Sequence, residues 1–316
     1  MEEDWPIVLP YTLDSEEASV LLDALHSELP EVSIEYHATP SATKEALIDA
    51  PIVVAFGFPD ELFSYAKSLR WVQALSAGVN TYNVNEFEQR GVKLTTVSGV
   101  HAQPAAEQAI GYMLAFERGF PEAFRHQHRG VWERYDVGEL HNSTVGIVGL
   151  GSIGERVAEL ASAFGVETIG LKRDLSTGGD VVDELVGPDG LESLLVRSDH
   201  VVLACPLTDK TRNMIDRTAL KTMNDNGVLL NVARGGLVKH SALVQALQRD
   251  WIRGAALDVV ADEPLDGDSP LWDLSNVILT PHMAGLTPRY MERCASIVAD
   301  NYRAFVAGNP LQNRIV

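Results

Sequence analysis

The 316-residue chain is 46% hydrophobic and 22% charged, a composition that can bury the cores of two domains. Its 44 acidic residues outnumber 25 basic ones, which gives a net charge of −19, and only seven of the bases are lysines. This charge argues against nucleic acid and anionic membranes as partners. The acidic excess is typical of proteins from salt-loving organisms, in which concentrated salt screens self-repulsion; an ordinary acidic cytosolic protein is the alternative.

Three features of the sequence predict a cytoplasmic protein. Residues 1–4 are acidic, unlike a secretory signal or a transit peptide. No apolar run approaches the roughly 20 residues that a membrane helix needs. Cys205 and Cys294 are the only cysteines, too few for a disulfide framework, which favours a reducing compartment.

Short apolar strands alternate with polar-faced helices over residues 1–99, which predicts a small flavodoxin-like domain with a parallel sheet. A turn directly follows the fourth predicted strand. There the consecutive amides of Ala77, Gly78 and Val79 can form an anion-binding nest, or the turn can be purely structural. The expected strands lie at residues 7–9, 32–36, 52–55, 71–75 and 92–95, and the first helix at 15–28.

Residues 100–116 have helical spacing, and residues 119–140 then combine four aromatic side chains with many charges. We expect this second segment to be an exposed arm that packs on the other subunit of a homodimer. His126 and His128 lie two residues apart and would not share a helix face, which argues against a metal site.

A strand-like apolar run leads into Gly149-x-Gly151-x-x-Gly154, and a helical pattern follows. A strand, a glycine turn and a helix in this order are the context that a dinucleotide-binding fingerprint requires. Gly149 permits the tight turn, Gly151 lets the backbone approach a pyrophosphate, and Gly154 lets the helix lie close to the strand. The amino-terminal amides of the helix, at Ser152 and Ile153, would face the phosphates.

Five further apolar strands predict a doubly wound dinucleotide-binding domain of about six strands over residues 100–286. After Pro288, a helix is expected over residues 289–307, ending at Gly308. It adds no strand, so we expect it to return to a substrate domain of residues 1–99 plus 287–316. This arrangement predicts an active site in the cleft between the two domains. The five strands are expected at residues 166–171, 201–204, 227–232, 254–259 and 277–280.

The strand after the glycine turn ends with two cations. An acidic residue at this point would bind the ribose 2′-hydroxyl of NAD, whereas cations favour the 2′-phosphate of NADP. Lys172 and Arg173 occupy the position, so we expect NADP(H), with NAD(H) kept open by the next residue, Asp174.

Three residues that can carry chemistry follow predicted strand ends: Arg234, Glu263 and His282. Ligands of open α/β sheets bind at the carboxyl ends of strands, so these side chains can converge. An arginine offers a bidentate fork for a carboxylate or a keto oxygen. A histidine can donate a proton near neutral pH, and a neighbouring carboxylate can orient its ring. Taken singly, each could equally be a surface or turn residue.

Together these motifs resemble the D-isomer-specific 2-hydroxyacid dehydrogenase family over nearly the whole chain. The resemblance implies that Arg234 binds the substrate carboxylate and polarises the carbonyl, that His282 is the general acid–base, and that Glu263 is its partner. The turn at 77–79 matches the family's carboxylate-binding loop. The matching motifs are Gly149-x-Gly151-x-x-Gly154, Asn231-Val232-Ala233-Arg234-Gly235, Ala256-Leu257-Asp258-Val259 with Glu263-Pro264, and Thr280-Pro281-His282-x-Ala284-Gly285.

The same resemblance extends the expected cofactor site. Asp258 matches the residue that holds the nicotinamide carboxamide, and Pro206 and Thr211 match the segment beside the adenosine half. Val232 and Gly285 complete the expected cofactor contacts. The implied activity is stereospecific reduction of 2-oxo acids to D-2-hydroxy acids with NADPH, and the reverse. A nucleotide-sensing corepressor of the same fold is the alternative.

Two relatives within the resemblance fit less well. Formate dehydrogenases of this fold pair the histidine with glutamine, where this chain has Glu263, and serine-pathway phosphoglycerate dehydrogenases often carry a further regulatory domain. The substrate is not identified by the sequence. Phe56 and Phe58 in a first-domain loop hint at tolerance for an apolar side chain.

Overall fold

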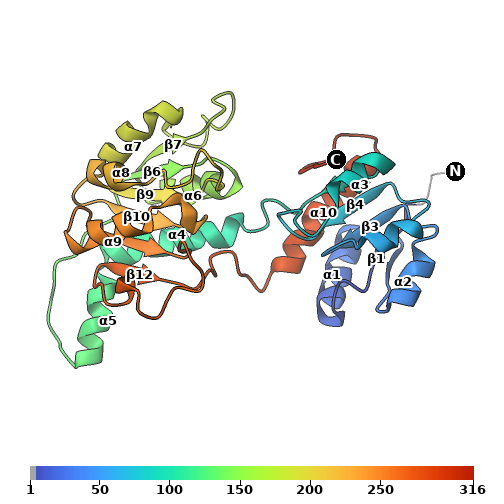
Figure 1. Ribbon diagram of the computed structural model, residues 1–316, viewed down its shortest axis with the longest axis horizontal. Coiled ribbons are helices and arrows are strands. Elements are labelled where there is room, and N and C mark those ends of the chain that lie inside the picture. The colour runs from blue at the N-terminus through green and yellow to red at the C-terminus, as the bar shows by residue number, and fades with distance from the viewer. Residues whose placement is uncertain (1–4) are drawn as a thin grey trace. The chain divides into compact units, whose positions relative to one another are not determined.

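The computed structural model describes residues 5–316, so the acidic residues 1–4 lie outside the described part of the chain. It divides into two compact units (Figure 1). Unit 1 comprises Met1–Val100 and Thr287–Val316, and unit 2 comprises His101–Leu286. Within residues 5–316, no helix is long and apolar enough to cross a membrane.

Unit 1 is built on a five-stranded parallel sheet in the order β2-β1-β3-β4-β5, the flavodoxin-like order. Buried apolar residues form separate cores on its two faces, since every strand of a doubly covered sheet contributes side chains to both. The strands are β1 (Ile7–Leu9), β2 (Ile34–Tyr36), β3 (Ile52–Ala55), β4 (Trp71–Ala74) and β5 (Lys93–Thr95). The helices are α1 (Ser15–Glu28), α2 (Pro40–Ala46), α3 (Val84–Arg90) and α10 (Tyr290–Val306), with a 3-10 turn, η1 (Asp60–Ser64).

Helices α1 and α10 pack together on one face of this sheet. Helix α1 begins where predicted because Asp14 caps it, accepting from the backbone of Glu16 and Glu17, while the Glu17 side chain accepts from the Asp14 amide. Helix α10 ends before Gly308, which has a φ of +71° and donates its N–H to the Phe305 carbonyl. The last helix therefore belongs to unit 1.

Unit 2 contains a seven-stranded parallel sheet in the order β12-β11-β10-β9-β6-β7-β8, a doubly wound Rossmann arrangement. Its strands are β6 (Thr144–Val148), β7 (Glu167–Leu171), β8 (Glu184–Val186), β9 (His200–Leu203), β10 (Val228–Asn231), β11 (Gly254–Leu257) and β12 (Val277–Leu279). The helices are α4 (Ala102–Glu117), α5 (Phe120–Arg129), α6 (Ser152–Ser162), α7 (Leu191–Arg197), α8 (Arg217–Thr222) and α9 (His240–Gln248), with 3-10 turns η2 (Pro188–Gly190), η3 (Gly235–Leu237) and η4 (Pro270–Trp272).

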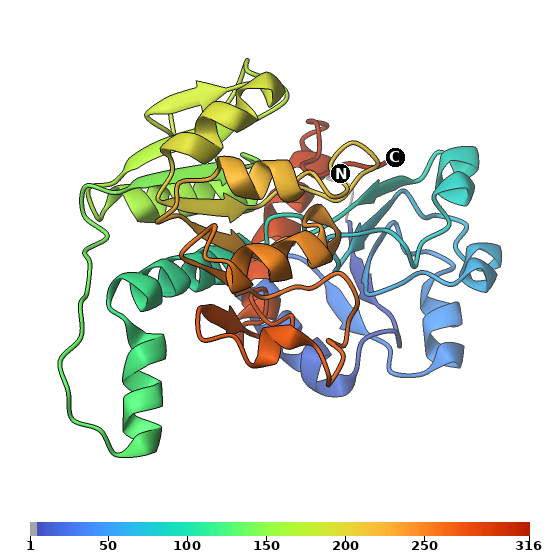
Figure 2. The same cartoon turned by 60° about the vertical axis from the view of Figure 1, so that its left-hand side comes forward.

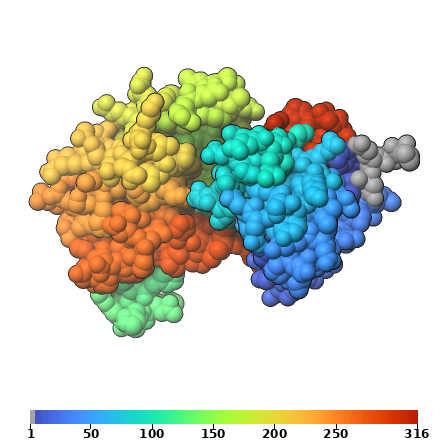
Figure 3. Space-filling view, turned by 45° about the vertical axis from the view of Figure 1, so that its right-hand side comes forward, coloured from blue at the N-terminus to red at the C-terminus, as the bar shows by residue number. Residues whose placement is uncertain are grey.

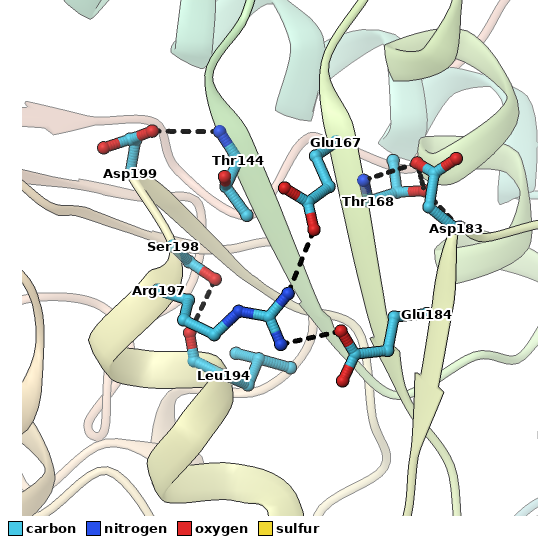
Figure 4. Close-up of polar contacts among 9 residues, drawn as sticks. All are labelled: Thr144, Glu167, Thr168, Asp183, Glu184, Leu194, Arg197, Ser198 and Asp199. Atoms are coloured by element: carbon cyan, nitrogen blue, oxygen red, sulfur yellow. Dashed lines mark hydrogen bonds and ion pairs between the residues drawn. The ribbon is translucent and has the colours of Figure 1, made fainter.

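The sheet has one strand more than the six predicted. The additional strand, β8, has three residues, all only partly buried, and it lies at the edge of the sheet. Such a strand lacks the apolar run that identifies the others. Polar contacts accompany its pairing with β7: the Arg197 guanidinium donates to both Glu184 and Glu167, at 2.6 and 3.0 Å, and the Asp183 carboxylate accepts from the Thr168 amide at 2.8 Å (Figure 4).

Residues 119–140, which we call the arm, leave the body of unit 2 (Figures 2 and 3). Helix α5 begins the arm and has no buried residue, and the chain then runs back without regular structure. The Trp132 side chain is fully exposed and Phe124 is 65% exposed. Exposed aromatic side chains of this size mark a surface that another molecule can cover.

Candidate active site

The glycine turn joins β6 to α6. Gly149 has a φ of +107°, and a Cβ there would lie 2.7 Å from the backbone nitrogen of Cys205. A Cβ on Gly154 would collide with the Gly149 carbonyl oxygen, whereas one on Gly151 would meet open space. The first and third glycines are thus required by the protein itself, and the second leaves room for a ligand. This fits a pyrophosphate at the amino terminus of α6, where Ser152 is the first helical residue and Ile153 the second.

A hollow of about 460 Å³ extends from this turn. Six of the predicted cofactor residues line it: Gly149, Gly151, Lys172, Arg173, Pro206 and Thr211. The Thr211 hydroxyl accepts from the Thr208 amide at 2.8 Å and donates to the Pro206 carbonyl at 2.8 Å, so it shapes the loop after β9. Lys210, in the same loop, also lines the hollow. Lys210 was not predicted from the sequence. Its position after a strand end was a usable signal, because the whole chain contains only seven lysines.

The charged residues at this hollow differ in whether another protein side chain already binds them. Lys172 lies 3.2 Å from Glu155 and is largely buried, whereas Arg173 and Lys210 are exposed and have no carboxylate partner within residues 5–316. Asp174 accepts hydrogen bonds from the hydroxyl and the amide of Ser176, at 2.6 and 3.0 Å, and these bonds lower the pKa of its carboxyl. Asp174, the acidic residue that left NAD(H) as the alternative cofactor, is therefore hydrogen-bonded within its own loop.

The predicted catalytic residues follow three neighbouring strands. In the sheet β11 lies between β10 and β12, with Leu257 paired to Asn231 on one side and Leu279 on the other. Arg234 follows β10, Glu263 follows β11 and His282 follows β12. Gly235 allows the first two loops to touch, because a Cβ there would overlap the Val260 carbonyl. The carboxyl ends of these strands thus carry all three side chains at one edge of unit 2.

His282 and Glu263 form a hydrogen-bonded pair. His282 Nδ1 lies 2.6 Å from Glu263 Oε2, and the other oxygen of Glu263 accepts from the Val260 amide at 3.2 Å. Within residues 5–316, His282 Nε2 has no hydrogen-bond partner, and the side chain is 53% exposed. One ring nitrogen is thus oriented by a carboxylate, and the other is open to a ligand.

Arg234 presents a guanidinium without a carboxylate partner among the described residues. Its loop is held by buried Asn231, whose amide group donates to the Arg234 carbonyl at 3.0 Å and accepts from the Ala233 amide at 3.1 Å. Val232, predicted to touch cofactor, is 6% exposed and packs in the core of the sheet. Within the motif Asn231–Gly235, Asn231 and Val232 therefore mainly shape the loop that carries Arg234.

Asp258 has a structural role that the sequence did not reveal. Its carboxylate accepts from the Thr280 hydroxyl at 2.5 Å and from the amides of Met283 and Ala284, both at 2.9 Å. Its own carbonyl accepts from the His282 amide at 2.8 Å. These bonds fix His282 at a φ of +51°, a conformation that non-glycine residues seldom adopt. Asp258 therefore shapes the histidine loop, whatever it also offers to a nicotinamide.

The remaining predicted positions are Gly285 in unit 2, and the turn at 77–79 and Phe58 in unit 1. In unit 2 the Gly285 carbonyl lies 3.0 Å from His101 Nδ1. In unit 1 the turn at 77–79 follows β4, and within residues 5–316 the amides of Ala77, Gly78 and Val79 donate no hydrogen bond. Three consecutive free amides fit an anion-binding nest. Phe58, suggested as a substrate contact, is instead 1% exposed and belongs to the core of unit 1.

The fold and these residues define a dinucleotide-binding α/β protein. A family model described as "D-isomer specific 2-hydroxyacid dehydrogenase, NAD binding domain" matches residues 110–284. The chain is 37% identical over 266 residues to a glyoxylate reductase of Aeropyrum pernix, covering 81% of this chain and 78% of the relative. It is 33% identical over 295 residues to a D-3-phosphoglycerate dehydrogenase of Methanocaldococcus jannaschii, covering 90% of this chain and 55% of that relative.

Solved structures agree in fold. A D-isomer specific 2-hydroxyacid dehydrogenase from Lactobacillus delbrueckii ssp. bulgaricus, in an NAD-complexed form, superimposes with a TM-score of 0.82 at 25% identity, covering 98% of this chain and 100% of that one. One from Xanthobacter autotrophicus, in complex with NADPH, gives 0.79 at 26%, covering 99% and 98%. The chain belongs to the D-isomer specific 2-hydroxyacid dehydrogenase family, a family of oxidoreductases, and unit 2 is its NAD(P)-binding domain.

Proposed function

We propose that this protein is a D-2-hydroxyacid dehydrogenase that reduces 2-oxo acids to D-2-hydroxy acids with NADPH, and catalyses the reverse reaction. The observation that carries the proposal is the oriented His282–Glu263 pair at the strand edge that also presents Arg234. The reductases named among its relatives support the same substrate class, small 2-oxo acids.

We assign each residue a role that its position and contacts support. Arg234 and the free amides at 77–79 bind the substrate carboxylate, and Arg234 stabilises charge that develops on the keto oxygen. Reduced nicotinamide, when bound, supplies the hydride. His282 Nε2 delivers a proton to the oxygen, while Glu263 holds the ring through Nδ1 and stabilises it when it is charged. In the oxidative direction His282 accepts the proton from the hydroxyl.

The preference for NADPH rests on the cations of the adenosine hollow. Arg173 and Lys210 face this hollow without a carboxylate partner in the described chain, and Lys172 adds a third cation. One oxygen of Asp174, Oδ1, already accepts both bonds from Ser176, whereas Arg173 and Lys210 have no such partner, which favours the cations as the ribose-side contacts. A 2′-phosphate therefore finds three donors here.

The direct test is a panel of 2-oxo acids of increasing length, from glyoxylate and pyruvate to branched acids, assayed with NADPH and NADH. We expect turnover of at least one acid, a lower KM for NADPH than for NADH, and a D-product on chiral chromatography. An L-product would contradict the stereochemical part of the proposal. Absence of turnover with every acid would contradict the proposed activity itself.

We further propose that the arm joins two copies of the chain in a homodimer. Its aromatic side chains, Phe120, Phe124 and Trp132, are exposed and find no cover in unit 2. Sedimentation velocity should give the mass of a dimer, and replacing Phe124 and Trp132 with serine should give a monomer. A monomeric wild-type protein at micromolar concentration would contradict this.

We also propose that the enzyme works in a cytoplasm of high salt concentration. The net charge of −19 repels itself within each copy, and salt reduces that repulsion. The thiols of Cys205 and Cys294 are free, as in a reducing compartment. The melting temperature should rise between 0.2 M and 3 M KCl, and a constant or falling value would contradict the proposal.

A further inference from the structure

Two tyrosine hydroxyls, of buried Tyr82 and partly buried Tyr290, bind the strand ends that flank the amide turn of unit 1. The Tyr290 hydroxyl donates to the Leu75 carbonyl at 2.7 Å, and Leu75 lies two residues before Ala77, the first residue of the turn. The Tyr82 hydroxyl donates to the Ala55 carbonyl at 2.6 Å, at the end of the neighbouring strand β3. Ala55 in turn accepts from the Leu75 amide at 2.8 Å, so the two strand ends are tied together.

The turn is also closed from within. The Ser76 hydroxyl donates to the Gly78 carbonyl at 2.6 Å, and the Ser76 carbonyl accepts from the Val97 amide at 3.2 Å. The carbonyls of Leu75, Ser76 and Gly78 are all engaged inside unit 1, whereas the amides of Ala77, Gly78 and Val79 remain available to a ligand. The shape of the nest thus depends on hydroxyl donors that do not themselves belong to it.

Tyr290 is itself firmly placed. It is the first residue of α10, which packs on α1, and its ring stacks on Phe56 with centroids 6.2 Å apart and planes 16° apart. Burial raises the pKa of the Tyr290 phenol, so its hydroxyl stays protonated and remains a donor well above neutral pH. Along the chain Tyr290 comes eight residues after His282, in the segment that enters unit 1 at Thr287.

We propose that Tyr290 is a positioning residue for substrate binding: by holding the Leu75 carbonyl, its hydroxyl keeps the amides of Ala77, Gly78 and Val79 directed at the carboxylate of the 2-oxo acid. This inference rests on the proposed function, in which the turn binds that carboxylate. Removing the hydroxyl loosens the turn without touching Arg234 or His282, so it weakens binding of the acid more than the chemical step.

The test is the conservative variant Tyr290→Phe, which keeps the ring and its stacking on Phe56. One neutral hydrogen bond corresponds to a change of about threefold to tenfold in an equilibrium constant. We expect KM for the 2-oxo acid to rise by about that factor, with kcat changed less than twofold and KM for NADPH unchanged. Oxamate, which mimics the acid but is not reduced, should inhibit the variant less by the same factor.

Tyr36→Phe is the matched control, because the Tyr36 hydroxyl donates to the Leu13 carbonyl at 3.0 Å in the same unit and away from the turn. It should leave every kinetic constant unchanged. Ser76→Ala provides a second route to the same effect, since it removes the bond that closes the turn from within, and it too should raise KM for the acid.

The outcomes separate the two levels of the proposal. Wild-type enzyme that reduces no 2-oxo acid would refute the proposed function. Wild-type enzyme that does so, together with a Tyr290→Phe variant whose KM for the acid and whose oxamate inhibition match those of Tyr36→Phe, would leave the function standing and overturn the role of Tyr290. Equal increases in KM for the acid and for NADPH would also overturn it, because they indicate general loosening of the fold.

Discussion

The amino ends and the carboxyl ends of the strands in the unit 2 sheet both carry arginine side chains, but these differ in whether a carboxylate binds them. At the amino ends of the strands, Arg197 is bonded to Glu167 and Glu184 (Figure 4). Arg253 is likewise bonded to Glu117. At the carboxyl ends, Arg234 has no carboxylate partner within residues 5–316. Charges that neutralise one another stabilise the fold, whereas those left without a protein partner are available to a ligand.

Histidines show the same contrast. His200, at the start of β9, is fully buried, with Nε2 3.1 Å from Glu117. His282, after β12, is half exposed and has only one nitrogen engaged. The difference teaches that the residue type at a sheet edge says little about function until its partners are known. Variants matched across the two edges can test this.

The largest effect is expected at His282. His282→Asn suits the test better than alanine, because asparagine tolerates the positive φ of +51° at this position. Loss of the general acid should lower kcat by about 10²- to 10⁴-fold with little change in melting temperature. His200→Asn should do the opposite, lowering the melting temperature and keeping turnover. Near-normal kcat in the His282 variant would remove its assigned role.

The next largest effect is expected at Arg234, which we compare with Arg197 at the amino ends of the strands. Arg234→Ala should lower kcat/KM for the 2-oxo acid by about 10²- to 10³-fold, since it removes a charged donor to the carboxylate and the oxyanion. KM for NADPH should stay the same. Arg197→Ala should leave kinetics intact and lower the melting temperature only slightly, as expected for solvent-exposed ion pairs. Steady-state kinetics and thermal melts of both variants decide the point.

The cofactor hollow extends the comparison to the adenosine side. Arg173→Gln should raise KM for NADPH by about tenfold, and addition of Lys210→Gln by up to about 100-fold, with KM for NADH within about twofold. Lys221→Gln is the control, because Lys221 lies over the Trp251 ring, away from the hollow. If NADPH and NADH were weakened equally, a 2′-phosphate site would be ruled out.

The smallest effect concerns Glu117. Burial favours its neutral form, but hydrogen bonds with His200 and Arg253 outweigh this and lower its pKa to about 2. A depressed carboxyl pKa stabilises the fold above pH 4.5 and loses that contribution as the pH falls towards 2. Glu117→Gln should therefore cost about 2 kcal/mol at pH 7, or roughly 4–8 °C in melting temperature, and much less at pH 3.

The control for this measurement is Glu192→Gln, at an exposed position without an ion pair in the described chain. Its melting temperature should follow that of the wild type at both pH values. A constant gap between Glu117→Gln and the wild type from pH 7 to pH 3 would show that the carboxylate does not titrate as described.

Much of the fold could be predicted because short sequence patterns specify the helices and strands. The capping box at Asp14 and Glu17 fixes the start of α1, and apolar runs, most of them buried, identify most of the strands. Helix α5 escaped prediction because it buries nothing; surface ion pairs such as that between Glu122 and Arg125 accompany it instead. Strand β8 escaped because a distant arginine, Arg197, stabilises it.

The residues of the site likewise fall into those that local sequence could predict and those that depend on distant contacts. Arg234, Glu263 and His282 could be named because each follows a strand, and parallel strands bring such residues to one edge. The contribution of Asp258 to the histidine loop could not be predicted, since its partners at Thr280, Met283 and Ala284 lie more than 20 residues away. Lys210 and Tyr290 were missed for the same reason: they matter through tertiary neighbours that no local pattern specifies.

The arm has a consequence for handling the protein. It holds Arg129 and Arg134 in exposed chain that unit 2 does not pack against. A trypsin molecule needs such a stretch of accessible backbone to cut. Cleavage there should divide the polypeptide into two pieces of unequal size, each retaining strands of its own. If a second copy covers the arm, as we propose, the rate of cleavage should fall as the enzyme is concentrated.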